Sequence, residues 1–189
     1  YLASYETDTT AYLEGTLNSE NSFEFEVPYN AKKDLANFHL LGNPFPFDMD
    51  MSKATYTNLV EGYAVVNPSD GGYKYFAVGS SQNTADGTIK VGDGFFVKAT
   101  GEDPSFSYNV ESRAKRGESF NSLNLIATGN AGEDNLVINL AGKQEGFPKL
   151  KNFNDDIATL FVENSDVKYG IFYCNENTTE VEVSFHANQ

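Results

Sequence analysis

Apolar and polar residues alternate with a period of two in short runs that recur along this chain of 189 residues. Residues two apart lie on the same face of a β-strand, so each run predicts a strand with one buried face and one face in water. We predict strands at Phe23–Val27, Phe38–Leu41, Phe95–Ala99, Leu136–Leu140 and Val181–Phe185. No window of a dozen residues has a convincing helical stripe of apolar residues, and only the segment 48–60 favours a single helical turn.

Turn-forming residues separate these runs at short intervals. The segments between the runs are rich in glycine, aspartate and asparagine, which tolerate the positive φ that tight turns require. The clearest examples are Asp70-Gly71-Gly72, Asp86-Gly87, Asp93-Gly94 and Gly129-Asn130-Ala131-Gly132. Many short strands with turns at this spacing predict an all-β fold, an antiparallel β-sandwich of the jelly-roll or immunoglobulin-like type.

The composition changes between Asn109 and Ser119, where the chain becomes polar and charged around a glycine. Such a stretch is typical of a connector between structural units. We predict two packed β units, residues 1–110 and 118–189, joined by a connector at 111–117, with the second unit truncated. A long crossover within one large sandwich is the alternative.

The chain has 13 Lys and Arg against 27 Asp and Glu, which gives a formal net charge of −14. Nucleic-acid affinity depends on neutralising phosphates with cationic side chains, so this charge argues against nucleic acids and anionic membrane surfaces as partners. No apolar run approaches the ~20 residues that a membrane-spanning helix needs, and we expect no membrane insertion. The chain begins at Tyr1 without an initiator Met, so we expect a piece of a longer precursor.

Catalytic motifs are missing from the sequence, which has no HExxH, no GxSxG and no metal-binding cluster of Cys and His. The one cysteine, Cys174, lies in an apolar run and is interpreted as a buried thiol. Gly92-Asp93-Gly94 lacks the third glycine of a phosphate-binding loop and is interpreted as a hairpin turn. Asp155 and Asp156 are adjacent, which favours a solvated bend over a catalytic pair. We expect a protein that is not an enzyme.

Four segments in a fixed order carry a family resemblance. They are Glu14-Gly15-Thr16-Leu17-Asn18 leading to Phe23-Glu24-Phe25, then Leu40-Leu41-Gly42-Asn43-Pro44-Phe45-Pro46, then Gly92-Asp93-Gly94-Phe95-Phe96-Val97-Lys98-Ala99, and finally Arg113 onward to Leu123-Asn124-Leu125. Together they resemble the repeated β-modules near the C-termini of large secreted and surface proteins of Bacteroidetes bacteria, including adhesin-like and type IX-secreted proteins. The family usually has Trp before the GNP segment, whereas this chain has no Trp and carries Phe38 in the equivalent place.

The resemblance implies a non-catalytic module that acts in adhesion, or as a spacer or presentation domain, at an extracellular or outer cell-surface location. Its partners would be an unknown protein or glycan, together with neighbouring domains of a larger precursor, and no cofactor is implied. In the family a further strand follows the one at Val181–Phe185, so we expect this strand to lie at a sheet edge. If the family segments are scaffold, Phe38, Leu40, Phe95 and Val97 belong to one core.

Asp48-Met49-Asp50 has the spacing of carboxylates in a calcium loop. An EF-hand would need glycine at the sixth position and glutamate at the twelfth, where this chain has Lys53 and Leu59. An irregular calcium site that includes Asp48 and Asp50 stays open beside the interpretation of two solvated carboxylates.

A carbohydrate-binding module is the alternative function. Tyr56, Tyr63 and Tyr73 lie in turn-rich stretches and are candidates for stacking on a sugar face. The absence of Trp weakens this interpretation, because Trp offers the largest stacking surface.

Overall fold

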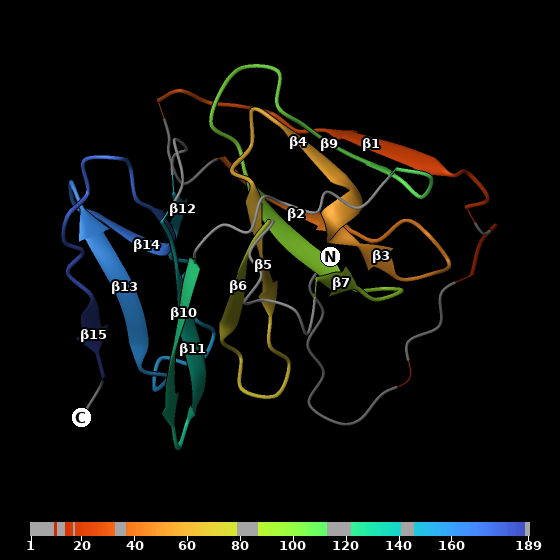
Figure 1. The fold of residues 1–189 in the computed structure, drawn as a ribbon. Helices are drawn as coiled ribbons and strands as arrows, with labels where there is room; N and C mark the ends of the chain where they lie inside the picture. Colours follow the sequence, from red (N-terminus) through yellow and green to blue (C-terminus); the bar gives the residue numbers. More distant parts are fainter. Residues whose placement is uncertain are drawn as a thin grey trace.

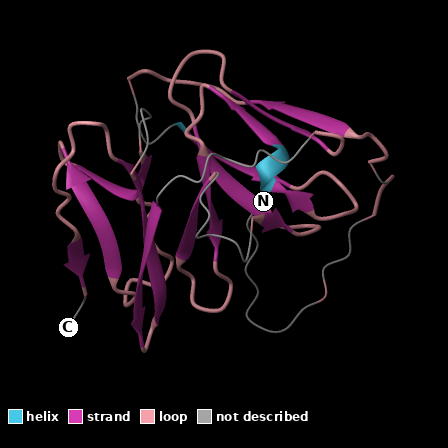
Figure 2. Cartoon of the chain, in the orientation of Figure 1, coloured by secondary structure: helices cyan, strands magenta, loops and turns pink. Residues whose placement is uncertain are grey.

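The computed structural model of this protein describes residues 10, 14–16, 18–32, 37–78, 87–112, 122–140 and 146–187. The protein is all-β, as the alternation predicts, and Figure 2 shows its many strands joined by loops and turns. Nine strands precede residue 112: β1 Ser22–Glu26, β2 Phe38–Gly42, β3 Met49–Asp50, β4 Ala54–Thr57, β5 Gly62–Val66, β6 Tyr73–Ala77, β7 Thr88–Ile89, β8 Gly94–Lys98 and β9 Ser105–Asn109. Six follow: β10 Ser122–Gly129, β11 Gly132–Asn139, β12 Phe147–Pro148, β13 Thr159–Asn164, β14 Val167–Tyr173 and β15 Ser184–His186.

A single 3₁₀ turn forms at Met51–Lys53, within the segment 48–60 where one turn was predicted. None of the described helical structure is long and apolar enough to cross a membrane. Residues 113–117 of the predicted connector lie outside the described residues. The Phe45–Pro46 bond is trans.

The strands form four sheets. The orders are β1-β9-β4, β2-β8-β5-β6, the pair β3-β7, and β10-β11-β14-β13-β15 with β12 paired to β14. All pairings are antiparallel except that of β11 with β14, which runs parallel over three residue pairs. Every sheet is therefore built from strands on one side of residue 112 or the other, and Figure 1 shows the β10–β15 sheet beside the four-stranded sheet.

The four-stranded sheet is covered on both faces. Phe95 and Val97 of β8 point into a first core that this sheet shares with β1, β4 and β9. Phe96, between them, packs toward a second cluster, here called the junction core. The junction core consists of Val60, Ala64, Tyr73, Tyr75, Ala77, Val137, Phe147 and Ile171. Because successive side chains of a strand point to opposite faces, a strand covered on both faces needs a continuous apolar run, which β8 has.

The predicted common core of Phe38, Leu40, Phe95 and Val97 is wrong. The register of β2 on β8 places Leu41 opposite Phe95, so Leu41 is the residue that enters the first core beside Phe95. Phe38 packs on the junction core, with its ring 5.4 Å from that of Phe147, and Leu40 is 36% exposed. A strand that is apolar on both faces does not reveal which face belongs to which core.

The strand predicted at Val181–Phe185 is shorter than expected and forms only at Ser184–His186. Within the described residues it pairs with β13 alone and lies at the end of its sheet, so the expected edge position is confirmed. The expected burial of its apolar residues is wrong, because Val183 and Phe185 are exposed and Val181 is only partly buried.

Candidate functional site

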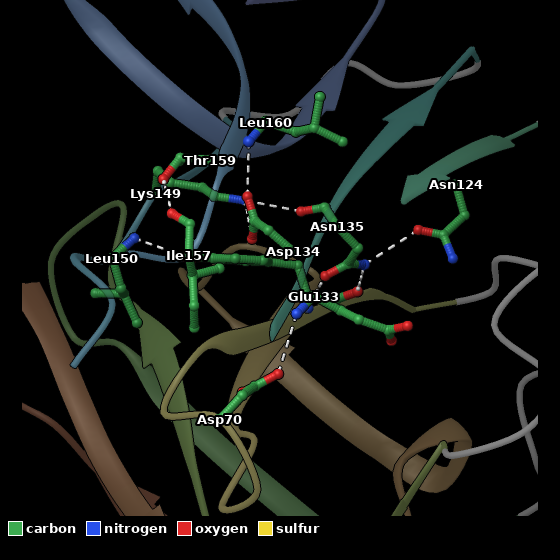
Figure 3. A network of polar contacts seen from close by, with 11 residues as sticks. Asp70, Asn124, Glu133, Asp134, Asn135, Lys149, Leu150, Ile157, Thr159 and Leu160 are labelled. Carbon is green, nitrogen blue, oxygen red and sulfur yellow. Dashed lines mark hydrogen bonds and ion pairs between the residues drawn. The ribbon is translucent and has the colours of Figure 1, made fainter. Parts of the chain in front are cut away.

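A buried ion pair lies where the β10–β15 sheet meets the four-stranded sheet (Figure 3). The Nζ atom of Lys149, which follows β12, lies 2.7 Å from Oδ1 of Asp134 on β11, with side-chain exposures of 4% and 0%. Nζ also donates to the carbonyl oxygen of Asn135 at 2.8 Å and lies 4.3 Å from the ring centroid of Tyr75 on β6. Oδ2 of Asp134 accepts a hydrogen bond from the backbone N–H of Leu160 on β13 at 2.7 Å. The contacts of this ion pair thus connect three strands, β6, β11 and β13, with the segment that follows β12.

Burial dominates the electrostatics of this pair. Desolvation lowers the pKa of Lys149 to about 8, although the charge of Asp134 and its hydrogen bond oppose that change. Desolvation likewise raises the pKa of Asp134, against the effects of Lys149 and of the Leu160 N–H. A pair of this kind adds little net stability compared with an apolar pair, but removal of one partner leaves an uncompensated buried charge. The pair therefore favours the one packing arrangement in which both partners meet.

Asn135 binds the edge of the neighbouring sheet. Its Oδ1 accepts from the backbone N–H of Tyr75 at 2.8 Å, and its Nδ2 donates to the Tyr75 carbonyl at 2.9 Å. Nδ2 also donates to Oδ1 of Asn124 at 3.1 Å. The Tyr75 hydroxyl accepts from the Leu150 N–H at 2.7 Å. Since β6 is the last strand of its sheet, the Asn135 amide supplies the hydrogen bonds that a further strand would supply.

The turn before β6 docks on the β10–β11 hairpin. Oδ2 of Asp70 accepts from the backbone N–H of Glu133 at 3.1 Å, and Oδ1 accepts from that of Gly72 at 2.8 Å. The hairpin residue Gly132 has φ +150°, and a Cβ built on it would lie 2.7 Å from Cβ of Asp70. Close approach of the two turns at this point therefore requires glycine.

A second feature is an open groove of about 660 Å³ beside the end of β1. Its lining includes Glu24 and Glu26 of β1, Tyr29, and the pair Glu102 and Asp103 that precedes β9. The two sides are joined by a hydrogen bond from the Val27 N–H to the Pro104 carbonyl at 3.1 Å. The groove thus presents four carboxylates and the partly buried ring of Tyr29.

The predicted calcium ligands have separate local roles. Oδ1 of Asp48 accepts from the Val91 N–H at 3.1 Å. Oδ1 of Asp50 accepts from the Ser52 N–H at 3.0 Å and the Ser52 hydroxyl at 2.6 Å, which caps the 3₁₀ turn. Among the described residues there is no group of three or more His, Cys, Asp or Glu that could hold a metal ion.

The predicted sugar-stacking residues lie in the interior, so this assignment is corrected. Tyr56 and Tyr63 belong to the first core and Tyr73 to the junction core, and all three are buried. Their rings pack against Phe106, Phe76 and Phe96 respectively. Large aromatic rings are needed to fill cores between sheets, and a turn-rich sequence context does not override that need. Cys174 is buried as predicted, which raises the pKa of its thiol.

The junction residues Asp134 and Lys149 were not identified from the sequence. Charged side chains are almost never fully buried unless they are paired, and their partner cannot be found from spacing along the chain. One signal was present, because Asp134 lies two residues before the apolar run Leu136–Ile138 in the same strand.

No family model matches this chain, and no curated protein or solved structure is significantly similar to it.

Proposed function

We propose that this chain is a non-catalytic β-module of a secreted or cell-surface bacterial protein, acting in adhesion or as a rigid spacer that presents a neighbouring domain. The observation that carries the proposal is the junction between two groups of sheets. One group consists of the three sheets built from β1–β9, and the other is the β10–β15 sheet. It combines an apolar core drawn from both groups with the buried pair Lys149–Asp134.

Units joined by a connector normally move relative to one another, because most interfaces within a chain are polar and modest in size. Here Tyr75 of β6 contacts Phe147 across the junction, with ring centroids 5.9 Å apart, and its backbone is bound by Asn135. A rigid orientation between units is what a spacer or presenting module needs, since mobile units would not hold a neighbour in place.

Rigidity can be measured with spin labels on exposed residues of the two groups, Thr55 on β4 and Glu163 on β13. We expect one narrow distance distribution that changes little with temperature below the melting transition. Lys149→Met should broaden it, while Lys151→Met, which removes an exposed ion pair with Asp155, should leave it unchanged. A broad distribution in the unsubstituted protein would exclude a rigid spacer.

Location requires a separate measurement in the organism that carries the gene. Labelling of intact cells with a membrane-impermeant reagent should modify the protein, while a cytosolic marker protein stays unlabelled. Recovery of the protein solely from the cytosol would contradict the proposed cell-surface role.

The second candidate, a carbohydrate-binding module, is favoured by the groove rather than by the three buried tyrosines. Carboxylates accept hydrogen bonds from sugar hydroxyls, and a ring such as Tyr29 offers a stacking face. On a glycan array followed by calorimetry, Tyr29→Ala or Glu26→Gln should weaken binding by about tenfold or more. Glu163→Gln, an exposed acid on β13, is the matched control. Absence of any glycan ligand would exclude this candidate.

A further inference from the structure

Strand β10 forms one edge of the β10–β15 sheet, here called the C-terminal sheet, and β15 forms the other (Figure 1). β10 pairs with β11 along its whole length of eight residues. Within the part of the chain that the structure describes, no strand pairs with its other side. Alternate backbone N–H and C=O groups of β10 therefore point away from the sheet, where another strand could bind them.

This edge lacks the features that usually prevent strand pairing. Proteins protect sheet edges with charged side chains, proline, bulges or very short strands. The segment Leu123–Gly129 contains no charged residue and no proline, and its register on β11 is uninterrupted. Leu123 and Ile126 are 50% and 59% exposed.

Two of the other sheet edges, β15 and β1, are better protected. β15 has three residues and comes soon after Glu180 and Glu182, and in β1 Glu24 and Glu26 alternate with Phe23 and Phe25. β10 is thus an uncharged eight-residue edge in a chain whose net charge is −14.

We propose that β10 pairs antiparallel with β10 of a second copy of this chain, which joins the two C-terminal sheets into one continuous sheet. Antiparallel pairing of a strand with itself is two-fold symmetric and self-complementary. Like charges opposite one another destabilise a strand pair, so two acidic copies pair best where each is uncharged. The charge pattern therefore favours a second copy at β10 over pairing through the acidic edge β1.

The pairing would also bury apolar side chains on both faces of the sheet. Leu125 lies opposite Leu136 and packs on the cluster of Leu136, Ile138, Val162 and Cys174. Ile126, the next residue, points to the other face, where it lies opposite Asn135. A second β10 would extend the apolar surface beside each of these side chains.

Sedimentation velocity from about 1 µM to about 1 mM tests the proposal, with Ile126→Lys and Phe185→Lys as a matched pair. Both residues are exposed to nearly the same extent, 59% and 60%, and they lie on opposite edges of one sheet. We expect a concentration-dependent dimer, a dimer dissociation constant raised about tenfold or more by Ile126→Lys, and no change with Phe185→Lys. Near-ultraviolet circular dichroism and the melting temperature of the diluted monomers should match those of the unsubstituted protein.

Cross-linking gives a second measurement. The one cysteine of the chain, Cys174, is buried, so Ile126→Cys introduces the accessible thiol that cross-linking needs. We expect a disulfide-linked dimer under mild oxidation from Ile126→Cys and little from Phe185→Cys.

A monomer at every concentration, or a dimer unaffected by Ile126→Lys, would overturn the proposal, even if the edge then bound an added peptide strand. Loss of the dimer with Phe185→Lys alone would assign the interface to β15 instead. A monomeric result leaves the rigid-spacer proposal untouched, because that proposal depends on the junction and not on β10.

Discussion

The side chain of Lys149 meets that of Asp134 at 2.7 Å in the interior, with the ring of Tyr75 4.3 Å from Nζ. The two charged residues come from the C-terminal sheet and the tyrosine from the N-terminal four-stranded sheet. Cation–π contact and ion pairing therefore act at the same point of the junction. Removal of either charged side chain would leave the other as an unpaired buried charge at the junction, which destabilises the fold.

Lys149→Met should destabilise the protein by about 3–5 kcal/mol, because it leaves Asp134 as an unpaired buried carboxylate. The double variant Lys149→Met/Asp134→Asn should recover most of that loss, since the Asn side chain keeps an acceptor for the Leu160 N–H without a charge. Urea unfolding of the two variants measures the difference.

The loss of stability in Lys149→Met, relative to the unsubstituted protein, should shrink as the pH falls. The reason is that protonation of Asp134 removes the unpaired buried charge. A single variant as stable as the unsubstituted protein at pH 7 would contradict the assigned role of the pair.

Phe95→Ala should cost about 3–5 kcal/mol as a large-to-small change in the first core. The Phe95 side chain is fully buried, and its ring lies 5.1 Å from that of Phe106. Phe185→Ala, at an exposed position on β15, should change stability by less than about 0.5 kcal/mol. Equal melting temperatures for Phe95→Ala and the unsubstituted protein would show that the first core does not depend on this ring.

Gly132→Ala should destabilise the protein by more than about 1 kcal/mol, because alanine is strained at φ +150° and its Cβ would meet Asp70. Gly129→Ala, at the other end of the same hairpin, is the control, since the nearest atom to its added Cβ is 3.9 Å away. Thermal unfolding of both variants provides the comparison. A larger loss from Gly129→Ala would refute the tight docking of the two turns.

Stability should fall as the pH rises above about 10, the ordinary pKa of tyrosine. Burial raises the pKa of Tyr56, Tyr75 and Tyr173, so these groups keep their protons in the folded protein when the unfolded chain has lost them. The folded state then binds more protons than the unfolded state, and the free energy of unfolding decreases with pH. Below about pH 10 the buried, protonated tyrosines make their full contribution to the free energy of unfolding.

Tyrosinate absorbance during an alkaline titration measures this directly, because the chain contains no Trp to obscure it. Part of the tyrosine signal should appear only with a cooperative loss of circular dichroism. Smooth titration of all 11 tyrosines near pH 10 in a folded protein would contradict the burial of these hydroxyls.

The sequence by itself determined the all-β class and the approximate positions of some of the strands. β1, β2, β8 and β11 all fall on or overlap predicted segments, and turn residues such as Asp93-Gly94 lie where strands begin or end. These properties are local, because side-chain alternation and turn chemistry depend on residues only a few positions apart.

Only the tertiary structure decided which face of each strand meets which core. Leu41 rather than Leu40 enters the first core, because the register on β8 and the covering of both sheet faces were set by strands far away in the chain. The same holds for Lys149, whose contacts with Asp134 and Tyr75 span 15 and 74 positions of sequence. Burial of charge depends on packing between sheets, and the pattern within a single strand does not identify the partner of a buried charge.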